Sequence, residues 1–161
     1  MPRFRLLTSE ELQELEPEFK QFLIINELYD KEWRELADKD PQKAEHFLAL
    51  FADIVLEKTY QKAQALVQIG HDFIALFLLQ EQQWQMLQFK FEAGIVPTDL
   101  NTDQLFGFLQ EQFGNATISR GSKTAPENKP EIVHQMIQNG AHMLGPNQAQ
   151  QMQELFDLIV A

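Results

Sequence analysis

Residues 73–93 read FIALFLLQEQQWQMLQFKFEA and carry the strongest indication of the fold class. From Leu87 to Ala93, apolar and polar side chains alternate, and this period of two is typical of a half-buried strand. Residues 73–79 form a short apolar run, and the polar residues 80–83 have the length of a hairpin connection. We therefore predict two antiparallel strands. The competing interpretation is one helix over the whole stretch, favoured by the helix propensities of Gln, Glu, Leu and Met.

A long helix is predicted upstream, beginning at Asp40 and Pro41. An aspartate can cap a helix by accepting a backbone amide, and proline fits the first helical position, where no amide is needed. We expect this helix to run to about Ile69 and to stop at Gly70. Its middle, residues 47–56, is apolar on nearly every side, which predicts that it is the central helix of the core.

The remaining segments predict shorter elements around this centre. Thr8 and Glu11 have the spacing of a capping box at the start of the first helix. The other expected helices begin near Pro17, Asp30, Thr102, Pro130 and Pro146. A third strand is expected at 116–119 and a flexible loop at 121–130. The fold class is therefore α+β, mostly helical, with a long central helix and a small antiparallel β-hairpin or three-stranded sheet, in a single globular domain over residues 1–161.

Composition narrows the possible functions. The 161 residues include no cysteine, which excludes disulfides, thiolate metal sites and a cysteine nucleophile. There are 24 acidic and 13 basic side chains, so the net charge is −11, and a broad nucleic-acid surface is not expected. The start of the chain has no apolar stretch like that of a secretory signal, and no run is long enough to span a membrane. We expect a soluble, cytoplasmic protein.

The sharpest enzymatic hypothesis uses His71 and Asp72. An adjacent His-Asp pair can place two ligands on one metal, as in metal-dependent phosphohydrolases of the HD type. Those enzymes add an upstream His, for which His46 is available, and a downstream Asp, for which Asp99 or Asp103 is available. The pair departs from that pattern because it follows Gly70 and precedes a predicted strand instead of lying on a helix. We expect no metal and no other cofactor.

Residues 119–124, SRGSKT, are the one concentrated basic and glycine-containing segment. They lack the spacing of a phosphate-binding P-loop because Ser122 separates Gly121 from Lys123. Arg120 and Lys123 are candidate ligand-binding residues for a small anion or an acidic peptide, and the alternative is a solvated loop tip. No catalytic residue is assigned. Asp53 interrupts the apolar run of the long helix but lies on its narrow polar strip, so solvent exposure accounts for it.

Two stretches resemble a family of small uncharacterised proteins from Bacteroidetes-type bacteria. One is the opening FRLLTSEELQELEPEFKQFLIIN, residues 4–26, and the other is residues 121–140 with the following alanine. The resemblance implies a bacterial, cytoplasmic setting and no known activity.

The leading functional hypothesis is therefore a non-catalytic interaction or regulatory module with a protein partner. One alternative is the HD-like metal-dependent phosphohydrolase. A second alternative, an acidic partner-neutralising protein of the immunity type, rests on the net charge.

Overall fold

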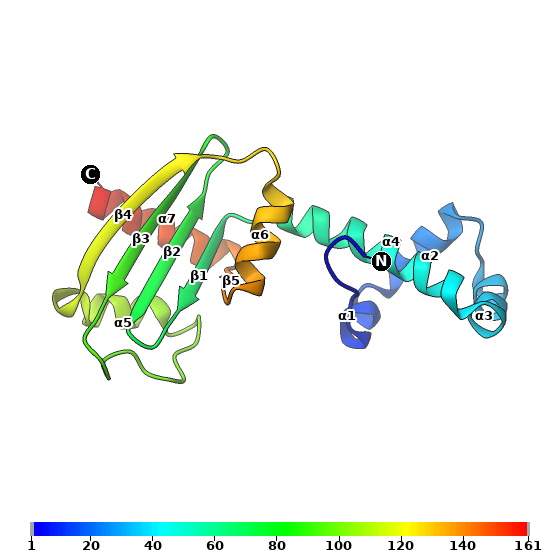
Figure 1. The fold of residues 1–161 in the computed structure, drawn as a ribbon, viewed down its shortest axis with the longest axis horizontal. Coiled ribbons are helices and arrows are strands. Elements are labelled where there is room, and N and C mark those ends of the chain that lie inside the picture. The colour runs from blue at the N-terminus through cyan, green and yellow to red at the C-terminus, as the bar shows by residue number, and fades with distance from the viewer. Residues whose placement is uncertain (1, 161) are drawn as a thin grey trace. The chain divides into compact units, whose positions relative to one another are not determined.

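The computed structural model describes residues 2–160, and its contacts divide the chain into two compact units (Figure 1). The first unit spans residues 1–61 and the second spans residues 62–161. The expectation of one globular domain stays a prediction. Helix and strand together confirm the α+β class.

The first unit contains the helices α1 (Ser9–Glu14), α2 (Glu16–Ile25), α3 (Asp30–Lys39) and α4 (Pro41–Gln61). The predicted capping box is present, because the Glu11 amide donates to Thr8 Oγ1 at 3.2 Å and the Thr8 amide donates to Glu11 Oε1 at 2.9 Å. Asp40 caps α4 as expected, with its Oδ1 accepting the Lys43 amide at 3.2 Å. Local signals in the sequence therefore set where α1 and α4 begin.

An aromatic cluster forms the centre of the first unit. The Phe19 ring lies 5.4 Å from that of Trp33 and 5.0 Å from that of Phe51. Phe22 also contacts Phe51, at 5.4 Å between centroids. These rings come from α2, α3 and α4, so aromatic packing holds the three helices together.

The long helix is shorter than predicted and does not have the predicted role. It ends at Gln61, and strand β1 (Ala65–Ile69) occupies the residues assigned to its end. Ala, Leu and Gln suit a helix, but β1 pairs with a neighbour on each side, and such tertiary pairing overrides local propensity. Since α4 belongs to the first unit and the second unit has its own core, the description of α4 as the central helix is wrong.

The predicted hairpin is confirmed, and the single-helix alternative is wrong. Strands β2 (Phe73–Leu79) and β3 (Gln83–Lys90) pair antiparallel, with Phe77 opposite Met86. The connection closes where the Gln80 amide donates to the Gln83 carbonyl at 3.2 Å.

The sheet, however, is larger than a hairpin or three strands. Within residues 2–160 it has five antiparallel strands in the order β4-β3-β2-β1-β5, where β4 is Thr117–Thr124 and β5 is His142–Met143. The predicted third strand is present, but it continues through Thr124 into the segment assigned to a flexible loop. Eight register pairs with β3 hold this polar segment extended.

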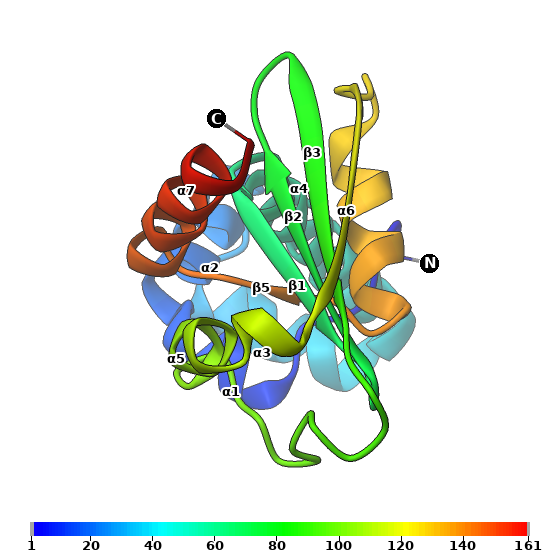
Figure 2. The same cartoon turned by 90° about the vertical axis from the view of Figure 1, so that its left-hand side faces the viewer.

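Helices cover both faces of the sheet (Figure 2). Helices α5 (Leu105–Glu111) and α7 (Pro146–Val160) lie on one face, and α6 (Lys129–Gln138) lies on the other. A 3₁₀ turn, Phe113–Asn115, follows α5. Helix α6 ends at Gln138, and the predicted stop residue Gly140 follows two residues later with a φ of 107°, a left-handed conformation that suits glycine.

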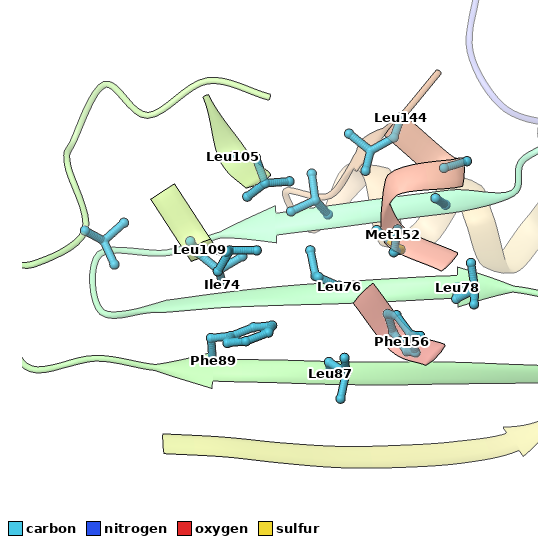
Figure 3. Packing of buried hydrophobic residues seen from close by; sticks show 14 of the residues in the cluster. Ile74, Leu76, Leu78, Leu87, Phe89, Leu105, Leu109, Leu144, Met152 and Phe156 are labelled. Atoms are coloured by element: carbon cyan, nitrogen blue, oxygen red, sulfur yellow. The ribbon is translucent and has the colours of Figure 1, made fainter. Parts of the chain in front are cut away.

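The hydrophobic core of the second unit lies between the sheet and helices α5 and α7 (Figure 3). Every second strand residue points into it, including Leu76 on β2 and Leu87 on β3. Leu105 comes from α5, and Met152 and Phe156 come from α7. The intervening strand residues point to the opposite face, where α6 lies.

Candidate functional site

The candidate site is a pocket of about 440 Å³ between α6 and the sheet, which we call the α6 pocket. Its apolar lining comes from β2, β3 and α6, namely Phe77, Leu79, Trp84, Met86, Ile132 and Met136. Polar groups line the rest: Gln68, Gln85, Gly121, Ser122, Lys123 and Asn139. The volume lies within the roughly 300–1,000 Å³ of small-molecule sites, and the mixed lining is typical of them.

The strand period explains why these residues gather. Phe77 and Leu79 alternate with the core-facing residues of β2, as Trp84 and Met86 do on β3. Ile132 and Met136 are four residues apart, so they share one face of α6. At one end of the pocket, the Gln68 side-chain amide donates to the Asn139 carbonyl at 3.1 Å, which ties β1 to the end of the helix.

Lys123 supplies the positive charge of the α6 pocket. It lies opposite Trp84 in the β3–β4 ladder, and its Nζ is 5.3 Å from the centroid of the indole ring. This cation–π contact holds the ammonium group beside the apolar lining. Among the side chains in residues 2–160, no carboxylate forms an ion pair with Lys123.

Arg120, the other predicted binding residue, faces the opposite side of the sheet. It is paired in register with the core-facing Leu87, and it lines a second pocket of about 650 Å³ together with Gln83 and Phe156. Both predicted cations therefore lie at pockets, but β4 separates them, and they do not converge on one small anion. Arg120 has no ion-pair partner within the described part of the chain either.

The proposed HD-type residues do not assemble. His71 lies in the turn between β1 and β2 with 86% of its side chain exposed, and its Nδ1 is 3.8 Å from Asp72 Oδ1. Asp72 also pairs with Lys90 Nζ at 3.6 Å, so it closes the end of the hairpin. His46 belongs to α4 of the first unit. In residues 2–160, no three His, Cys, Asp or Glu side chains are grouped so that they could hold a metal ion.

Asp53 has a structural partner. Its Oδ1 accepts the backbone amide of Arg3 at 2.7 Å, and one turn further along α4 Glu57 pairs with the Arg3 side chain at 3.2 Å. Phe4 packs edge-on against Tyr60 at 5.2 Å between ring centroids. The carboxylates on the polar strip of α4 therefore hold the start of the chain against this helix.

Arg5 continues this attachment by pairing with Glu11 at 2.8 and 2.9 Å through two of its nitrogens. The hydrogen bond from Arg5, followed by that from the Thr8 amide, lowers the pKa of Glu11 from 4.5 to about 2.

Sequence reasoning found Lys123 but missed the α6 pocket. A signal was present in β2, whose residues are apolar on both faces, and such a strand is normally covered on both faces. The alternation in β3 indicates only the side that faces α5 and α7. It gives no signal that Trp84 and Met86, on the other side, belong to a site.

Comparison with known proteins places the chain in a family. A family model described as a family of unknown function (DUF6495) matches residues 1–159, so the chain belongs to this family. The resemblance to an uncharacterised family is thereby confirmed. The chain matches no curated protein and no solved structure. Helices that combine enough length and apolar character to cross a membrane are absent from residues 2–160.

Proposed function

We propose that this family member is a non-catalytic interaction module, and that its α6 pocket recognises an apolar group with a neighbouring negative charge. The observation that carries the proposal is the ammonium group of Lys123, which has no carboxylate partner among residues 2–160 and lies at an apolar pocket.

The charge of the site differs from that of the whole chain. The protein carries a net charge of −11, yet Lys123 is the one ionisable side chain among the described residues that line the α6 pocket. A ligand carboxylate would form a charge-assisted hydrogen bond with this ammonium group, and such bonds are about twice as strong as neutral ones. The pocket therefore favours an anion, although the surface as a whole repels one.

The lining favours an apolar body for this ligand. Phe77 and Trp84 offer flat aromatic surface, and Met86 and Met136 are flexible side chains that adapt to different shapes. Burial of apolar surface supplies most of the free energy of binding at such a site, and Lys123 orients the ligand.

The same lining argues for binding without catalysis. A lone ammonium group offers no acid–base pair, and the pocket-lining serine, Ser122, has no adjacent histidine or carboxylate in the lining to activate it. The HD-like phosphohydrolase loses its basis because its candidate ligands do not come together. The immunity-type alternative rests on net charge and gains no support from the site.

The proposal includes a protein partner, a cytoplasmic location and an origin in Bacteroidetes-type bacteria. It assigns the protein neither nucleic acid nor a membrane as a binding partner, and no cofactor.

The test uses anilinonaphthalene sulfonate, a fluorescent apolar anion. Replacement of Trp33 by Phe leaves Trp84 as the sole tryptophan, so energy transfer from Trp84 to the bound dye reports binding near β3, and the Lys123 and Arg120 variants distinguish the α6 pocket from the second pocket. We expect saturable binding of one dye molecule, weakened about five- to tenfold in Lys123→Gln through loss of a charged contact.

Arg120→Gln is the matched control, because Arg120 is on the same strand and has the same charge but faces the other side of the sheet. It should change the affinity less than about twofold. Equal losses in both variants, or no energy transfer from Trp84, would contradict the proposed site.

A further inference from the structure

Strand β4 forms an open edge of the sheet beside the α6 pocket. It pairs with β3, and within residues 2–160 no segment pairs with its outer side. Every residue of β4 except Ile118 is exposed. Such an edge offers unpaired backbone amides and carbonyls to another extended chain.

The hydrogen-bond pattern identifies which residues of β4 face outward. The Ala125 amide donates to the carbonyl of Gln82, the residue directly opposite in the ladder, at 2.9 Å. Hydrogen-bonded pairs alternate along an antiparallel ladder, so the odd-numbered residues 117–123 bond to β3. The backbone groups of the alternate residues point away from the sheet, at Ile118, Arg120, Ser122 and Thr124.

We propose that an acidic, extended segment of a partner protein adds to β4 as a sixth, antiparallel strand and places an apolar side chain over the α6 pocket. This inference rests on the proposed function and specifies its ligand as a peptide. Outward backbone groups are complementary to a peptide backbone, and strand addition is an established mode of peptide recognition.

Charge selects an acidic segment in preference to a second copy of this chain. β4 carries Arg120 and Lys123 and no Asp or Glu. Two β4 strands would therefore bring four cations together without a carboxylate, and like charges on paired strands are destabilising. An acidic strand would instead place opposite charges beside both cations.

The register specifies a short motif in the partner. Directly opposed residues on paired strands share a face, so acidic residues are needed opposite Lys123 and opposite Arg120. Gly121 has no side chain, and the space above it ends at the Met86 methyl group, 3.7 Å from the position of a Cβ. An apolar residue opposite Gly121 can lean across this space. From N- to C-terminus, the motif is acidic, any residue, apolar, acidic.

The experiment uses the full chain and a fluorescent peptide, Thr-Glu-Thr-Leu-Glu-Thr-Val-Thr, followed by fluorescence anisotropy. The matched control peptide exchanges the third and fourth residues, which moves the leucine to the other face of the strand. We expect the first peptide to bind about tenfold more tightly than the control. The leucine of the first peptide faces the α6 pocket, whereas the leucine of the control peptide faces the other side of the sheet.

The decisive variant is Ser122→Pro, which removes an outward amide without removing a bond to β3. Proline is tolerated at edge positions of this kind. We expect at least about fivefold weaker peptide binding than in Ser122→Ala, which keeps the amide. Because Ser122 also lines the α6 pocket, dye binding is compared between the two variants. Ser122→Pro and Ser122→Ala should bind anilinonaphthalene sulfonate equally, which shows that the proline leaves the fold and the α6 pocket intact.

The outcomes separate this inference from the proposed function. Equal peptide binding by Ser122→Pro and Ser122→Ala would overturn strand addition, and so would a peptide that does not bind while the dye still binds through Lys123. Self-association of the chain that Ser122→Pro abolishes would show that a second copy occupies β4, and would also overturn the inference. If dye binding by the parent protein did not depend on Lys123, both proposals would be overturned.

Discussion

Two pairs of basic side chains have opposite surroundings in the two units. In the first unit, Arg3 pairs with Glu57 and Arg5 pairs with Glu11. In the second unit, Arg120 and Lys123 have no ion pair within residues 2–160. The first pair fixes the start of the chain, whereas the second pair lies on an open strand edge.

Among the described residues, basic side chains that stabilise the fold of this protein are paired, whereas those available for binding are not. Carboxylates outnumber basic groups by 24 to 13, so a basic side chain that serves the fold has ready partners. Strand β4 supplies none, and a lysine on a sheet edge discourages pairing with neutral strands. The same charge favours an acidic strand, because complementary charge selects among partners.

The largest effect is expected from Phe51→Ala, which tests whether the two units unfold independently. Phe51 is 3% exposed and contacts Phe19 and Phe22, so Phe51→Ala should destabilise the first unit by about 3–5 kcal/mol. Each unit contains one of the two tryptophans, Trp33 and Trp84. Phe51→Ala is introduced into a Trp84→Phe protein, in which Trp33 fluorescence reports the unfolding of the first unit. It is also introduced into a Trp33→Phe protein, in which Trp84 fluorescence reports the unfolding of the second unit. Both are unfolded with denaturant.

The single-domain prediction requires both unfolding transitions to move together in Phe51→Ala. A shift of the Trp33 transition alone would show that the units unfold separately. Phe89→Ala is the matched variant in the second unit, because Phe89 is fully buried in the core between the sheet and the helices.

A smaller effect is expected from the attachment of the start of the chain. Asp53→Asn weakens the hydrogen bond from the Arg3 amide by removing the charge of its acceptor, and we expect a loss of about 1 kcal/mol. Arg120→Gln is the control and should change the free energy of unfolding by no more than about 0.5 kcal/mol, since Arg120 forms no ion pair in the described structure. An equal loss in both variants would remove the distinction between the two pairs of charges.

Much of the first unit could be predicted because its signals are local. The Thr8–Glu11 capping box and the Asp40–Pro41 step specify helix starts through neighbouring residues alone. Strand β1 and the second half of β4 could not be predicted in the same way. Ala65, Leu66 and Gln68 suit a helix and residues 121–124 suit a loop, yet both segments become strands through pairing with distant segments.

The candidate site shows the same division. The charges of Arg120 and Lys123 were visible in the sequence, but their placement on opposite faces depends on β4 being a strand. The α6 pocket depends on α6 returning to the sheet, which follows from no local pattern. The two-sided apolar pattern of β2 was the available signal, and it predicts a second covered face without saying which helix covers it.

The smallest expected effect is a pH dependence carried by Glu11. Arg5 lowers the pKa of Glu11 to about 2 in the folded chain, against an ordinary value of 4.5. A carboxyl group whose pKa is lowered on folding stabilises the folded state above its unfolded value, and this contribution is lost as the pH falls. The loss should therefore occur between about pH 4.5 and about pH 2. Because the pair is partly exposed to solvent, we expect less than about 1 kcal/mol.

Glu11→Gln isolates this charge, since glutamine can still serve the capping box. At pH 7 the variant should be slightly less stable than the parent, and the difference should shrink as the pH falls from 4.5 towards 2, because the parent then becomes uncharged at Glu11 as well. Urea unfolding followed by Trp33 fluorescence in the Trp84→Phe protein measures it. In an Arg5→Gln background the pH-dependent difference should largely disappear, because Arg5 is the main cause of the lowered pKa. If the difference persisted there unchanged, Arg5 and Glu11 would no longer exemplify a charge pair that serves the fold, and the contrast with β4 would rest on Arg3 alone.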